Sequence, residues 1–150
     1  MADAATAKLA QLKALQQLRL AQSRAELGKQ MAQLATTEER LVAENVQLRS
    51  DETALQAVLA ADHFNTDELR LTSLVAERQR RITAMTEGAR DEKLTLEGEA
   101  RQAAAACEVQ AEHLNAAHRE ATRRWAEKSD AKQAAEIISL AVTQSRRNHR

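Results

Sequence analysis

The sequence predicts an all-α protein in which two long helices form an antiparallel coiled-coil hairpin, the second helix being the longer. Two features of the composition support this fold class. Proline is absent and glycine occurs three times, so few residues would interrupt a helix. Trp and Phe occur once each and Tyr not at all, so the bulky side chains that fill a globular core are scarce. Helices that pair along a narrow seam need only a leucine or alanine at each contact.

The first helix is expected over about residues 4–61, with Asp3 as a candidate cap. Six leucines follow one another at a seven-residue spacing: Leu20, Leu27, Leu34, Leu41, Leu48 and Leu55. A heptad row of this kind keeps one edge of a helix against a partner. The companion row, taken four residues after each leucine, is mostly polar: Arg24, Met31, Glu38, Asn45, Glu52 and Leu59. We therefore expect a thin seam, or a surface left for another protein.

The hairpin turn is expected at residues 62–66. Asn65 and Glu68 have the spacing of a capping box, with Thr66 as an alternative cap. Phe64, just before the cap, could pack onto the new helix as a hydrophobic staple.

The second helix is expected over about residues 67–146. Its apolar heptad row consists of Val75, Ile82, Ala89, Leu96, Ala103 and Ala117. The companions of this row are Leu71 and Met85 before Gly88, and Ala100, Cys107, Leu114 and Ala121 after Gly98. This change of side predicts a shift in packing register within residues 88–98, where the two glycines weaken the helix. The main seam residues of this helix are therefore Val75, Ile82, Leu96 and Leu114.

The unequal helix lengths predict an unpaired end. At about 1.5 Å per residue, the helices rise roughly 85 Å and 120 Å. If they pair from the turn, the second outruns the first by roughly 20 residues, starting near Trp125. Together, residues 1–150 are expected to form a single hairpin.

The unpaired end holds the candidate partner-binding residues. These are Arg123, Arg124, Trp125, Ile137, Ile138, Leu140, Arg146 and Arg147. Trp125 would either plug the open end of the hairpin or anchor a partner. The arginines either belong to a solvated face and complement the C-terminal end of the helix, or guide docking onto an acidic surface. The isoleucines and Leu140 favour an interface, because a two-helix hairpin has nothing left to cover them.

The sequence contains no pattern that points to catalysis, a metal or a cofactor. His113 and His118 are five residues apart, which places them on different sides of a helix, with no further ligand nearby. Cys107 lies among seam residues, where a small buried side chain is expected rather than a nucleophile. There is no phosphate loop and no nucleophile elbow. We expect no enzymatic activity.

Charge and hydropathy limit the partners and the compartment. Basic and acidic residues balance at 22 each, which argues against a nucleic-acid binder. The sequence has one cysteine, no signal-peptide core at its start and no apolar stretch of about 20 residues. A cytoplasmic protein that does not insert into a membrane is therefore expected.

The chain resembles the FliJ/YscO (SctO) family of stalk proteins of type III secretion and flagellar export. The resemblance covers a leucine- and glutamine-rich first helix, a turn with an aromatic residue, and a longer second helix. That helix has a tryptophan in a charged frame, Arg123-Arg-Trp-Ala-Glu-Lys-Ser129, and a basic tail. The low aromatic content is more similar to the injectisome branch. The resemblance implies a stalk at the inner-membrane export apparatus, with the end that carries both termini inserted into a hexameric secretion ATPase. The shaft would contact the export gate and, in some members, secretion chaperones.

Two other functions remain open from the residues. The leucine row could pair with its own copy, which would make the chain a homodimeric zipper-like scaffold or tether unrelated to secretion. A cytosolic chaperone with helical arms is a third possibility.

Overall fold

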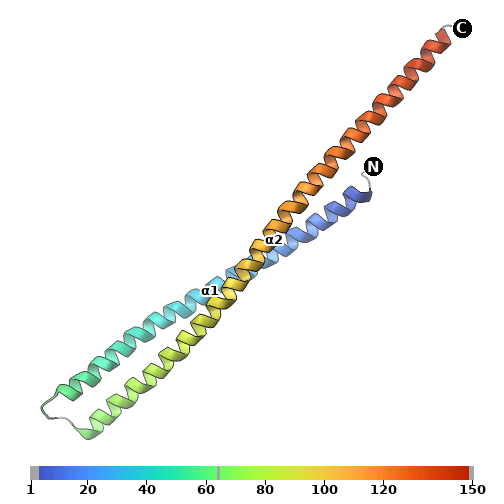
Figure 1. Cartoon of the computed structure of the whole chain (residues 1–150). Helices are drawn as coiled ribbons and strands as arrows, with labels where there is room; N and C mark the ends of the chain where they lie inside the picture. The colour runs from blue at the N-terminus through green and yellow to red at the C-terminus, as the bar shows by residue number, and fades with distance from the viewer. Residues whose placement is uncertain (1–3, 64, 149–150) are drawn as a thin grey trace. The chain divides into compact units, whose positions relative to one another are not determined.

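The computed structural model describes residues 4–63 and 65–148, without the side chains of residues 5, 6 and 145–148. Helix α1 spans Ala4–Ala60 and helix α2 spans Thr66–Asn148, and a short turn joins them (Figure 1). The two helices pack against each other, which confirms the all-α hairpin. With 57 residues in α1 and 83 in α2, the second helix is the longer, as expected.

Asn65 begins α2. The backbone N–H of Asp67 donates to Asn65 Oδ1 at 2.9 Å, and that of Leu69 donates to the Asn65 carbonyl at 3.0 Å. A side-chain oxygen that satisfies a free N–H of the first turn is the function of an N-cap, so Asn65 is confirmed in this position. The expected Asp3 cap and Phe64 staple lie outside the described residues.

The chain divides into two compact units, to which both helices contribute. Residues 23–104 form the turn unit, which contains the hairpin turn. Residues 1–22 and 105–150 form the terminal unit. Each unit is an antiparallel pairing of one segment of α1 with one segment of α2.

In the turn unit, α1 faces α2 through the leucine row. Leu41 is buried at 9% exposure, and the other leucines of the row in this unit are half-buried. The companion row is three residues after each leucine rather than four: Ser23, Gln30, Thr37, Glu44, Asp51 and Val58 are half-buried. Met31 and Leu59, which the four-residue spacing would place inside, are 50% and 56% exposed. The alternating spacing of three and four residues is that of a regular coiled-coil seam.

The stripe of α2 that faces α1 lies one residue beyond the apolar row seen in the sequence. The least exposed positions repeat at alternating steps of three and four residues: Leu69, Thr72, Ala76, Gln79, Thr83, Thr86, Arg90, Lys93, Glu97, Ala100 and Ala104. Ile82 and Leu96 are half-buried at the edge of this stripe, whereas Val75 is 45% exposed and lies outside the seam. One residue corresponds to about 100° around a helix. The apolar row therefore lies on the side of α2 next to the seam, which we call the flank.

This spacing continues unchanged past Gly88 and Gly98, which contradicts the expected shift in register. Arg90, Lys93 and Glu97 continue the alternating steps of three and four residues that separate Thr83, Thr86 and the positions before them. The heptad row of leucines on α1 is uninterrupted, and a helix that follows it must keep one register.

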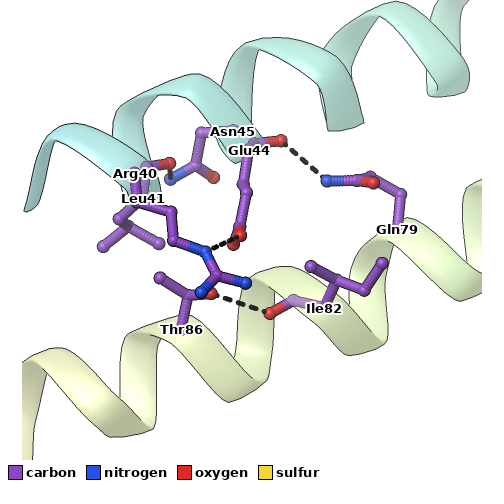
Figure 2. A network of polar contacts seen from close by, with 7 residues as sticks. All are labelled: Arg40, Leu41, Glu44, Asn45, Gln79, Ile82 and Thr86. Atoms are coloured by element: carbon purple, nitrogen blue, oxygen red, sulfur yellow. Dashed lines mark hydrogen bonds and ion pairs between the residues drawn. The ribbon is translucent and has the colours of Figure 1, made fainter. Parts of the chain in front are cut away.

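Polar contacts take the place of apolar packing along the seam (Figure 2). The Gln79 side chain donates to the Glu44 carbonyl at 3.3 Å, and Lys93 Nζ donates to Gln33 Oε1 at 3.1 Å. Such bonds offset the cost of removing polar groups from water. Small residues, among them the fully buried Ala76, leave room for the two backbones to approach.

Glu44 lies in this polar seam. The Thr86 hydroxyl and the Arg40 guanidinium, whose Nε lies 2.7 Å from Glu44 Oε1, lower the pKa of Glu44 below its usual 4.5, against the raising effect of burial. The charged carboxylate is thus the form that the fold favours.

Not every buried oxygen in the turn unit is satisfied. Thr83 is 4% exposed, and its Oγ1 finds no hydrogen-bond partner among the described residues. The same holds for Gln30 Oε1. An unsatisfied buried group costs about 1–3 kcal/mol, so this seam is weaker than an apolar one.

Candidate partner-binding surface

In the terminal unit, the contacts of Gln16 set the register. Its Nε2 donates to the Cys107 carbonyl at 3.3 Å and to Gln110 Oε1 at 3.1 Å. Gln16 is 5% exposed, so it is part of the seam. The stripe of α2 that faces α1 then continues through the buried Ala111 and the half-buried Leu114, His118 and Ala121.

Beyond Ala121 the stripe stops. Ala4 is twelve residues before Gln16, so in an antiparallel pair it faces α2 about twelve residues beyond Cys107 and Gln110, near residues 119–122. Of residues 122–144, every side chain except Ser129 is exposed. We call residues 122–144 the overhang.

The overhang carries most of the predicted partner-binding residues. Ile137, Ile138 and Leu140 are each about two-thirds exposed, at 66%, 63% and 65%. Trp125 is the least exposed of the four side chains, at 39%. It lies four residues beyond Ala121, the last half-buried position of the stripe. The structure therefore places these apolar side chains on a segment that nothing described in the chain covers.

The apolar side chains of the overhang point to more than one side. At about 100° per residue, Ile138 and Leu140 are roughly 200° apart around the helix axis. A helix with one apolar stripe packs on a single neighbour, whereas one with apolar groups on opposite sides is suited to being enclosed. The overhang has the second arrangement.

The arginines beside Trp125 are partly neutralised within α2. Arg123 Nε lies 3.3 Å from Glu127 Oε1, and Arg124 pairs with Glu120. Exposed pairs of this kind contribute little to stability, so a partner could compete for these arginines at small cost. The side chains of the predicted Arg146 and Arg147 lie outside the described residues.

Within residues 4–63 and 65–148, no group of three or more His, Cys, Asp or Glu side chains could hold a metal ion. None of the helices in this part of the chain is long and apolar enough to cross a membrane. His113 is exposed and His118 is half-buried at the seam.

One exposed apolar surface of α2 differs from what its sequence pattern predicts. The pattern predicts Leu71, Val75 and Met85 in the seam, but in the turn unit they are 64%, 45% and 76% exposed. The signal was present in the sequence, since α2 has two stripes with heptad spacing. Only packing against α1 distinguishes which of them is inside.

Compared with known proteins, the chain matches no protein-family model, no curated protein and no solved structure.

Proposed function

We propose that the chain is a non-enzymatic stalk of a type III secretion system, which inserts its overhang into the hexameric secretion ATPase. The observation that carries this proposal is the overhang itself. It is an exposed helix with apolar side chains on opposite sides, as expected of a segment that a ring of subunits encloses.

In this role the hairpin acts mechanically. A single asymmetric helix inside a ring of identical subunits makes different contacts with each of them, and so stabilises different subunits in different states. ATP hydrolysis would then be coupled to protein export, with the shaft in contact with the export gate and with secretion chaperones. This places the protein in the cytoplasm, at the inner-membrane export apparatus.

The test uses the cognate secretion ATPase in pull-down and ATPase assays with the full chain. In the variant Ile137→Gln/Ile138→Gln/Leu140→Gln, binding should fall at least about tenfold, because exposed apolar anchors carry most of the energy of an interface. The matched control is Val109→Gln, since Val109 is also on α2 and is 53% exposed, but lies before the overhang. No binding by the wild-type chain, or equal binding by the triple variant, would refute the proposal.

The homodimeric zipper has less support. The leucines that it would use for pairing are half-buried or buried within the hairpin. Light scattering, together with a distance measured between labels at residues 20 and 107, distinguishes the two. A monomer with close labels fits the stalk, and a dimer with distant intrachain labels fits the zipper.

A further inference from the structure

The exposed apolar row on the flank of α2 in the turn unit has the spacing of a second coiled-coil seam. Its members follow one another at steps of four and three residues: Leu71, Val75, Arg78, Ile82, Met85 and Ala89. We call these residues the flank stripe. Single exposed apolar residues are common on protein surfaces, but a row with this alternation runs parallel to the helix axis. It extends from residue 71 to residue 89, which corresponds to a rise of about 27 Å along the helix.

The flank stripe borders a groove between the two helices. A hollow of about 320 Å³ is lined by Ile82, Met85, Thr86 and Ala89 of α2 and by Thr37 and Arg40 of α1. A second hollow of about 470 Å³ also includes Thr37 and adds Lys29, Ala32, Gln33, Thr36 and Lys93. The surface is therefore a shallow groove along the pair of helices, which is the shape that receives a third helix.

The charges around this groove are mainly basic. Arg78 lies in the middle of the flank stripe and is exposed, and among the described residues it forms no ion pair. Lys29 and Lys93 border the second hollow, where Lys29 Nζ lies 4.0 Å from Glu26 Oε2. Arg40 borders the first hollow and pairs with Glu44. A single charged residue within an apolar seam sets the register of the helix that pairs with it.

We propose that the flank stripe and this groove bind one amphipathic helix of a partner protein, with an acidic residue opposite Arg78 and acidic residues at its edges. The apolar row supplies the contact area, and the arginine selects the sign of the partner and its register. This surface belongs to the turn unit and does not involve the overhang, so the inference goes beyond the proposed function.

The test uses two synthetic helical peptides of about 21 residues with the same leucine and isoleucine face. One peptide carries glutamates at the edges of this face and the other carries lysines. Binding of the labelled peptides to the full chain is measured by fluorescence anisotropy. The glutamate peptide should bind at least about tenfold more tightly than the lysine peptide.

Variants of the full chain locate the site. Met85→Glu should weaken binding of the glutamate peptide at least about tenfold, and Arg78→Glu should reverse the preference between the peptides. Leu94→Glu is the matched control, because Leu94 is 50% exposed on the same helix. It is nine residues from Met85, which at about 100° per residue places it on the opposite side of α2. Circular dichroism checks that each variant keeps its helices, and Met85→Gln replaces Met85→Glu if the latter unfolds.

Three results would overturn the proposal. The first is that neither peptide binds, and the second is that Leu94→Glu weakens binding as much as Met85→Glu. The third is a wild-type dimer, seen by light scattering, that Met85→Glu dissociates, because the occupant would then be a second copy. The overhang variant Ile137→Gln/Ile138→Gln/Leu140→Gln should bind the glutamate peptide like the wild type, so failure of this proposal and failure of the stalk proposal are distinguishable.

Discussion

Two stripes of α2 in the turn unit reverse the usual relation between polarity and burial. The buried stripe includes Thr83, Thr86 and Glu97, each at 7% exposure or less, whereas the flank stripe exposes Leu71 and Met85. If α1 were the only helix that α2 packs against, the apolar row of α2 would be expected to face α1. The intramolecular seam of this hairpin therefore does not use the most apolar stripe of α2. That surface stays available for another helix.

The largest effect is expected at Leu41, the one large apolar side chain that is buried among the described residues of the turn unit. Leu41→Ala should reduce the free energy of unfolding by about 2–3 kcal/mol, near the lower end for buried leucines because solvent can reach a narrow seam. Urea unfolding followed by circular dichroism measures the change. Val42→Ala is the control, since Val42 is 65% exposed, and it should change stability by less than about 0.5 kcal/mol. Equal effects would show that α1 does not face α2 through the leucine row.

A gain in stability is expected from making the buried stripe less polar. Thr83→Val removes the Oγ1 that is buried without a partner among the described residues, and should raise the free energy of unfolding by about 1 kcal/mol. In Thr86→Val the hydroxyl that is lost donates to the Ile82 carbonyl at 3.2 Å and also lowers the pKa of Glu44, so a loss of stability rather than a gain is expected. The same urea measurements compare the two variants. A loss of stability in Thr83→Val would show that its hydroxyl is satisfied in solution.

The polar seam should also make stability depend on acid. The pKa of Glu44 is lowered in the folded chain, so its contribution is present above 4.5, the usual pKa, and is lost as the pH falls through the lower folded value. Glu44→Gln removes this contribution. The difference in Tm between wild type and variant should therefore shrink as the pH is lowered from about 6 to about 3. A difference that stays constant over this range would exclude Glu44 as a source of the acid dependence.

A smaller effect is expected on the flank opposite the apolar row. Arg80 Nε and Glu52 Oε1 form an ion pair between the helices at 2.9 Å, with 55% and 38% of their side chains exposed. A double-mutant cycle with Arg80→Ala and Glu52→Ala should give a coupling energy of about 0.2–1 kcal/mol, which falls as salt is added. A larger coupling would mean that this flank, too, contributes to holding the helices together.

The smallest effect on stability is expected in the flank stripe itself. Met85→Gln replaces a side chain that is 76% exposed, and should change the free energy of unfolding by less than about 0.5 kcal/mol. Thermal and urea unfolding of the full chain measure it. A large loss would mean that Met85 packs within the hairpin, and would remove the contrast between the two stripes.

Much of the fold could be predicted from local patterns. Without proline, few residues interrupt a helix. The leucine row and the Asn65 cap depend only on residues within one or two helical turns, and the structure confirms both. The companion row of the α1 leucines was predicted incorrectly. The row three residues after each leucine and the row four residues after it are both mostly polar, so composition does not distinguish them. The candidate partner surface followed from helix lengths, but its exposure on opposite sides of α2 depends on where α1 ends relative to α2.

By itself, the sequence determined that there are two helices, where the turn lies, that the second helix is longer and that α1 pairs through its leucines. Helix propensity, capping and heptad spacing are properties of a single segment, so they are readable along the chain. Only the tertiary structure decided which stripe of α2 faces those leucines. α2 has two stripes of equal spacing, and one residue of rotation exchanges them. Their burial depends on contacts such as Gln79 with Glu44 and Lys93 with Gln33, which join residues far apart in the chain.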